Sequence, residues 1–177
     1  YCSRVCCMYA IKQAMLISGA LPLAEITIYY MDIRTFGKGY EQFYQNAKAM
    51  GVEFVRGKVA SIREDEKHNP IIKVELTEEG RIIERTHDLV VLSLGMIPTA
   101  SPSIFNLLPS SDGFIFLPAL NASPSATARP GIFVTGAAGG PMDIVDSIVT
   151  AGAAASEASA YIREKTGTPI VQQEVAY

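Results

Sequence analysis

The hydrophobic and polar positions of the first half of the chain alternate between two periods. They predict a helix that ends at about Ser18, a strand over 25–31, a helix over 40–50 that Gly51 closes, and a short strand over 52–56. Helix, strand, helix and strand in this order are typical of a parallel α/β sheet. The first half therefore predicts part of such a sheet.

The pattern then becomes a series of short strands. We expect strands over 58–64, 71–76, 81–85 and 88–94, because the turn residues at 65–70 and 79–80 separate them. Strands this short and this closely spaced predict an antiparallel meander. The meander ends where an apolar run enters Gly95 and Pro98, and the chain is expected to change domain there.

The remainder is looser and ends in a long helix. Residues 99–130 are rich in Pro, Ser, Ala and Asn, with one strand candidate over 114–117. A buried strand is predicted over 131–136, followed by a glycine-rich turn and a helix over 144–165. Asp143 is its predicted N-cap, with Asp146 at the third helical position. Gly152 and the surrounding alanines favour close packing of this helix on a sheet or another helix.

Composition narrows the class of protein. The 177 residues are 49% hydrophobic and 19% charged, with a net charge of -3. This balance suits a globular protein and argues against a nucleic-acid partner. Apolar runs fall short of the roughly 20 residues that span a bilayer, so we expect a soluble, cytoplasmic protein without a direct membrane span. The chain opens inside a motif, which predicts a piece of a larger protein.

The three cysteines of the chain, Cys2, Cys6 and Cys7, stand within its first seven residues. In a helix, Cys2 and Cys6 would share a face and Cys7 would lie beside it. Thiolates select soft metals and iron–sulfur clusters, but zinc sites and cubane clusters usually have four protein ligands. The trio therefore predicts an incomplete metal site.

Other interpretations of the cysteines stay open. They could be small buried hydrophobic residues, or two of them could form a disulfide. A structural zinc would instead make the chain a zinc-stabilised, non-catalytic interaction module. A thiol–disulfide enzyme is less favoured, because the spacing Cys-x-x-x-Cys-Cys differs from Cys-x-x-Cys.

Four segments in this order resemble one family. They are Cys-Ser-Arg-Val-Cys-Cys at 2–7, Tyr-Met-Asp-Ile-Arg-Thr-Phe-Gly at 30–37, Leu-Val-Val-Leu-Ser-Leu-Gly at 89–95, and Gly-Pro-Met-Asp-Ile at 140–144 before the alanine-rich helix. Together they closely resemble the A subunit of heterodisulfide reductase, a flavoprotein. The A subunit of the quinone-interacting membrane-bound oxidoreductase is similar.

The resemblance implies an α/β fold, as a fragment of an FAD/NAD(P)-binding, Rossmann-like two-domain flavoprotein with a parallel sheet and an antiparallel meander. Residues 1–98 would be a nucleotide-binding-like insert domain with its meander, and residues 99–177 the C-terminal part of the FAD-binding domain. The implied function is oxidoreductase electron transfer between FAD and 4Fe-4S clusters. The implied partners are other subunits of a heterodisulfide reductase-like or quinone-interacting complex. Residues 1–177 alone are expected to be inactive.

The resemblance also implies site residues. Cys2, Cys6 and Cys7 match cysteines that hold a 4Fe-4S cluster, with the fourth ligand upstream. The flavin would meet the turn and helix N-terminus formed by Gly136, Gly140, Pro141, Met142, Asp143 and Ile144. Many relatives carry an acidic residue where this chain has Ala137 and Ala138. The Gly-x-Gly-x-x-Gly fingerprint is absent, so residues 1–177 alone are expected to bind FAD weakly or not at all.

An NAD(P)H-dependent FAD disulfide oxidoreductase is the alternative. Asp32 follows the strand over 25–31, where an acidic side chain can accept ribose hydroxyls, and Arg34 or Lys38 could contact a phosphate. The helix that should bring glycines to the pyrophosphate begins with cysteines instead. Because the glycine requirement is steric, NAD(P)H is possible but a cluster in its place is favoured.

Overall fold

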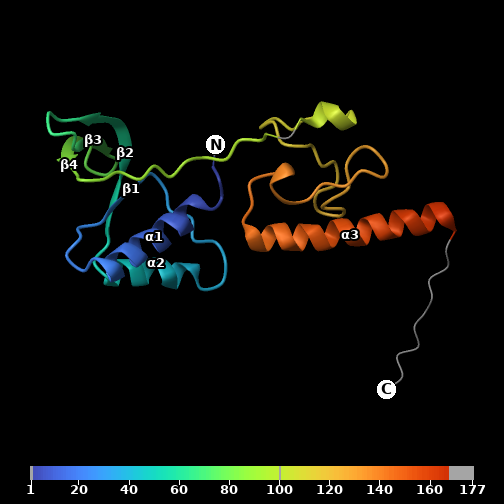
Figure 1. Ribbon diagram of the computed structural model, residues 1–177, viewed down its shortest axis with the longest axis horizontal. Helices are drawn as coiled ribbons and strands as arrows, with labels where there is room; N and C mark the ends of the chain where they lie inside the picture. Colours follow the sequence, from blue (N-terminus) through green and yellow to red (C-terminus); the bar gives the residue numbers. More distant parts are fainter. Residues whose placement is uncertain (1, 100, 168–177) are drawn as a thin grey trace, which may run out of the picture. The chain divides into compact units, whose positions relative to one another are not determined.

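The structure, a computed structural model, describes residues 2–99 and 101–167. It divides into two compact units (Figure 1). One is Arg4–Gly95, and the other consists of the remaining described residues. Each unit has its own buried apolar cluster. The assignment of these units to an insert domain and an FAD-binding domain stays a prediction.

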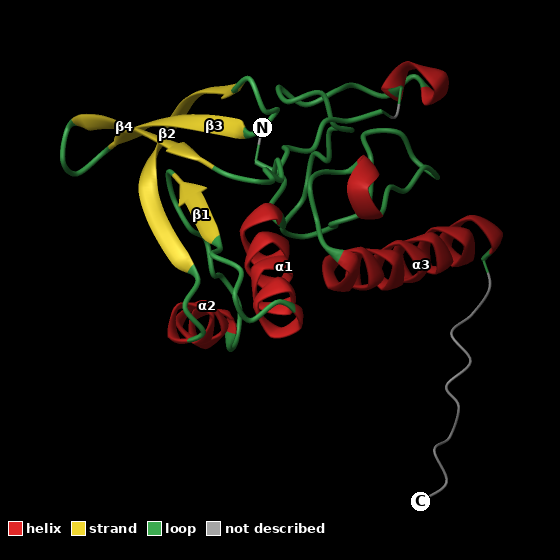
Figure 2. Ribbon diagram, turned by 60° about the vertical axis from the view of Figure 1, so that its left-hand side comes forward, coloured by secondary structure: helices red, strands yellow, loops and turns green. Residues whose placement is uncertain are grey.

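The first unit begins as the predicted parallel α/β arrangement. Strand β1 (Thr27–Tyr30) pairs in parallel with the first residues of strand β2 (Glu53–Glu64). Helices α1 (Cys6–Ala20) and α2 (Tyr40–Ala49) lie next to each other and pack on one face of these strands (Figure 2). Their buried contacts are Ile11 and Ala14 of α1, Ala47 of α2, and Val52.

The two strands predicted over 52–56 and 58–64 are a single strand, so the expected break between them is wrong. Strand β2 continues through Gly57 and pairs antiparallel with β3 (Pro70–Leu76) over its second half. A Cβ atom on Gly57 would lie 2.6 Å from the carbonyl oxygen of Glu75 and 2.7 Å from Cγ1 of Val74. Glycine therefore lets the strand change partners here, because the neighbouring backbone approaches too closely for a side chain.

The meander adds β4 (Arg81–Thr86), and the sheet order is β1-β2-β3-β4. The predicted fourth meander strand over 88–94 is wrong, because these residues form no ladder with any described residue. Within it, Leu89 is 75% exposed and Leu92 is 62% exposed. An apolar run of this kind needs a partner to become a strand.

The second unit consists largely of turns above one long helix. It contains the 3-10 helices η1 (Pro102–Phe105) and η2 (Gly136–Ala138) and helix α3 (Ile144–Thr166). Leu107, Ile115 and Val134 form its core. The strands expected over 114–117 and 131–136 are wrong, since these segments form only the isolated bridges Pro109–Ile115 and Ala126–Phe133.

Helix α3 begins and ends close to the predicted residues, but it is not buried. The predicted cap is confirmed, because Asp143 Oδ1 accepts the backbone amide of Asp146 at 2.7 Å. No residue of α3 is buried among the described residues, and nothing lies within 4 Å of a Cβ placed on Gly152. The expected close packing of its small residues is therefore not seen in this part of the chain. Across the described residues, no helix is both long and apolar enough to cross a membrane.

Candidate cofactor sites

The cysteines lie at the N-terminus of α1. Cys6 and Cys7 are its first two residues, whereas Cys2 is exposed and precedes the helix. The expected helical pairing of Cys2 with Cys6 is therefore wrong, because the helix starts four residues later than that pairing requires. The sulfur of Cys7 lies 3.9 Å from the backbone oxygen of Asp32, just past the carboxyl end of β1.

This position is chemically suited to a negatively charged sulfur. The first backbone amides of a helix have no partner within the helix, and its dipole is positive at that end. All three cysteines are thiols rather than part of a disulfide. Across the described residues, however, no three His, Cys, Asp or Glu side chains are close enough together to hold a metal ion. The donor chemistry suits a soft metal centre, and the described chain supplies fewer than three converged ligands.

The residues considered for NAD(P)H stand beyond the end of β1. The carboxylate of Asp32 lies 3.5 Å from Nε of Arg34, and both side chains are about two-thirds exposed. This ion pair occupies the acid that would receive a ribose. Arg4 also approaches this loop, since its guanidinium carbon lies 5.3 Å from the ring centre of Phe36.

The predicted flavin-facing turn is fixed to α3 by a residue that sequence reasoning missed. Thr150 Oγ1 accepts the amide of Gly136 at 3.1 Å and the hydroxyl of Thr135 at 3.0 Å. It also lies 3.7 Å from the sulfur of Met142. A polar residue among alanines on a predicted helix is the sequence signal that could have pointed to Thr150.

At the start of α3, one predicted contact residue already has a structural role. The Oδ1 atom of Asp143 caps the helix through Asp146, and its backbone oxygen accepts the Ser147 hydroxyl at 2.7 Å. The amides of Ile144 and Val145 precede the first intrahelical bonds and remain at an exposed helix end. Backbone amides, more than the Asp143 carboxylate, are therefore what this end offers to an electron-rich ring.

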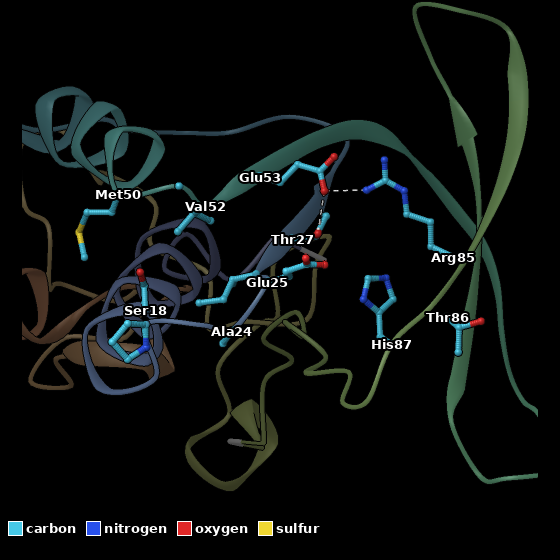
Figure 3. A pocket seen from close by; sticks show the side chains of 13 residues that line it. Ser18, Ala24, Glu25, Thr27, Met50, Val52, Glu53, Arg85, Thr86 and His87 are labelled. Carbon is cyan, nitrogen blue, oxygen red and sulfur yellow. Dashed lines mark hydrogen bonds and ion pairs between the residues drawn. The ribbon is translucent and has the colours of Figure 1, made fainter.

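Sequence reasoning also missed a pocket in the first unit. It measures about 680 Å³ and lies where β1 and β2 begin and β4 ends (Figure 3). Glu53 Oε2 accepts Arg85 Nη1 at 2.6 Å and the Thr27 hydroxyl at 2.9 Å. Next to this group, the Tyr29 hydroxyl lies 2.8 Å from Nε2 of His87. These residues are far apart in sequence, so no local spacing announces them.

The electrostatics of this group follow from its hydrogen bonds. The bond from Arg85 holds the pKa of Glu53 below its ordinary value, against the opposing effect of partial burial. The same bond raises the pKa of Arg85. Burial raises the pKa of Tyr29, which therefore stays a neutral phenol at physiological pH. The group consists of an ion pair beside a neutral hydrogen-bonded pair.

The comparisons with known proteins agree with this geometry. A thioredoxin reductase from Lactococcus lactis superimposes with a TM-score of 0.65 over 87% of this chain and 50% of its own, at 19% identity. The fold is thus that of the FAD/NAD(P)-binding oxidoreductases. No protein-family model matches the chain.

Curated relatives are more specific. One iron-sulfur A subunit of CoB–CoM heterodisulfide reductase from Methanopyrus kandleri, the second of that name, is 44% identical over 98% of this chain and 28% of its own length. The corresponding A subunit from Methanocaldococcus jannaschii is 46% identical over 90% of this chain and 25% of its own. The chain belongs to the family of heterodisulfide reductase A subunits. It spans about a quarter of the length of these relatives.

Proposed function

We propose that the chain is part of an electron-transfer flavoprotein within a heterodisulfide reductase-like complex, where it passes electrons between FAD and 4Fe-4S clusters. The identity of 44% over 98% of the chain to a relative named as an iron-sulfur subunit carries this proposal. The placement of Cys6 and Cys7 at the N-terminus of α1 supports it.

The cysteine position favours a cluster over a pyridine nucleotide. In a nucleotide-binding unit, the helix after the first strand must let its backbone approach a pyrophosphate, and glycines make that possible. Here two sulfur-bearing side chains stand at the corresponding helix start, and Arg34 engages Asp32. We assign Cys2, Cys6 and Cys7 as cluster ligands, with the remaining ligand outside residues 1–177. A cluster held there would supply one-electron chemistry.

The flavin assignment rests on the start of α3. Gly136 has a φ of +63°, a conformation that suits glycine, and this lets η2 turn back toward α3. We assign Gly136, Gly140, Pro141, Met142, Asp143 and Ile144 as the residues nearest the flavin. The helix amides would stabilise negative charge on the reduced ring.

The cluster assignment is tested by iron analysis of the longer polypeptide that contains this chain. Replacement of Cys6 by serine should remove about four iron atoms per polypeptide and the matching brown absorption. Gln13→Ser, at an exposed position of the same helix, should leave both unchanged. Residues 1–177 alone should bind little iron. A full cluster in this short form would refute the missing fourth ligand, and a colourless zinc stoichiometry would refute the cluster.

The flavin assignment needs its own pair of variants. Ile144→Glu adds a negative charge at the first turn of α3, where it favours the helix dipole but opposes a reduced flavin. We expect the flavin potential of the longer polypeptide to fall. Ile148→Glu, one turn further along and similarly exposed, should change it less. Equal effects would place the flavin elsewhere. Saturable NADH binding lost in Asp32→Ala would favour the NAD(P)H-dependent alternative.

A further inference from the structure

Strand β1 has a partner on one side only. The order β1-β2-β3-β4 leaves its other edge without a ladder among the described residues. The two strands at this end of the sheet are parallel. Parallel sheets are normally covered on both faces and bordered by further strands, so an open edge here exposes backbone groups that favour pairing.

An unpaired apolar segment lies on the same side of the sheet. Residues 88–95 follow β4, and four of their aliphatic side chains are between 62% and 75% exposed: Leu89, Val91, Leu92 and Leu94. Val90 packs against the cluster that contains Val55 and Tyr29, and His87 bonds to Tyr29. The segment is thus held beside β1, although it forms no ladder with it.

The two flanks run in the same direction from one starting point. β2 is parallel to β1, and two antiparallel steps through β3 return β4 to that same direction. The pocket of about 680 Å³ separates their starts, with residues 24–27 on one wall and residues 85–87 on the other. Figure 3 shows Thr27 and His87 on these opposite walls. The pocket is the open end of a space between two parallel flanks.

The chain topology defines what belongs in this space. Helix α2 connects β1 to β2, and α1 leads into β1 while packing on the same face as α2. Connections between parallel strands are right-handed in almost all proteins. A strand that leads into α1 must therefore lie on the side of β1 away from β2, which is the open edge.

We propose that a further β-strand, contributed by the same polypeptide from outside residues 1–177, inserts parallel to β1 between β1 and residues 89–94. Those residues then become the strand on its far side. The relatives leave room for it, since this chain spans only 25–28% of their length. The inserted strand ends beside Cys6, so it also sets the position of the loop that enters α1. The inference depends on the sheet and not on which cofactor is bound.

Hydrogen exchange tests the proposal directly. In the longer polypeptide, the backbone amides of Thr27–Tyr30 and Leu89–Leu94 should exchange about 100-fold more slowly than in residues 1–177 alone. Equally fast exchange in both forms would overturn the proposal. Protection in residues 1–177 that rises with protein concentration would overturn it too, since a second copy would then occupy the edge.

Paired lysine substitutions provide a second test. Leu92 and Ile82 are about equally exposed, at 62% and 59%. In the longer polypeptide, Leu92→Lys should lower the thermal midpoint of unfolding and restore fast exchange at β1, because an inserted strand buries Leu92. Ile82→Lys on β4 should leave exchange at β1 unchanged. If Leu92→Lys is as harmless as Ile82→Lys, no strand covers that segment.

Discussion

The hydroxyl of Tyr29 lies 2.8 Å from Nε2 of His87, which joins strand β1 to the first residue after β4. The bond is partly buried, and a bond of this kind contributes about 1 kcal/mol to stability. Tyr29→Phe should lower the free energy of unfolding by that amount in urea titrations. Tyr40→Phe, which removes a hydroxyl from the more exposed ring of Tyr40, should have a smaller effect. Equal losses would mean that the Tyr29 bond adds nothing.

Acid should weaken the pocket wall through Glu53. Because the Arg85 hydrogen bond holds its folded-state pKa below the unfolded value, Glu53 stabilises the fold above about pH 4.3, the ordinary glutamate pKa. That contribution is lost as the pH falls through the lower, folded-state pKa. The pair is about half exposed, so the contribution is at most about 1 kcal/mol. Glu53→Gln should flatten this part of the stability profile, whereas Glu66→Gln in the β2–β3 turn should not.

Asp143 offers a test of its two roles. Asp143→Ala removes the cap of α3 and should cost about 1 kcal/mol. Asp143→Asn keeps a good capping side chain and should cost much less, as followed by the helical circular dichroism signal on heating. If both variants lose the same stability, the negative charge matters more than the hydrogen bond.

Gly57 should be intolerant of any side chain. Gly57→Ala places a Cβ against the backbone of Glu75 and should destabilise the first unit by about 1–3 kcal/mol. Gly19→Ala, within α1 and with nothing within 4 Å of the added Cβ, should be neutral or slightly stabilising. Urea midpoints of the two variants distinguish these outcomes. Similar midpoints would indicate that β2 and β3 can separate without loss.

The sequence predicted elements well where the pattern is local. Both helices of the first unit, the meander strands around 71–76 and 81–85, and the Asp143 cap depend on residues a few positions apart, and all are present. It failed where a strand depends on a partner. Residues 88–94 have a strand pattern but no ladder among the described residues, and residues 114–117 and 131–136 form only single bridges.

The candidate sites show the same division. The cysteine motif and the turn before α3 could be singled out from the sequence because their residues are contiguous. The group formed by Glu53, Arg85, Tyr29 and His87 is assembled from three separate strands and the residue after one of them. Thr150 acts on a turn fourteen residues away. Neither relationship exists until the chain folds.

Strand β2 belongs to both halves of its sheet, because β1 pairs with its beginning and β3 with its end. A disturbance of the meander therefore acts on the only ladder partner that β1 has among the described residues. The cysteine-bearing end of the unit and the meander should consequently unfold in one cooperative step, as a single exchange unit. A ligand or protein partner that bound the meander would thereby tighten the ground on which the cysteines stand, without touching them.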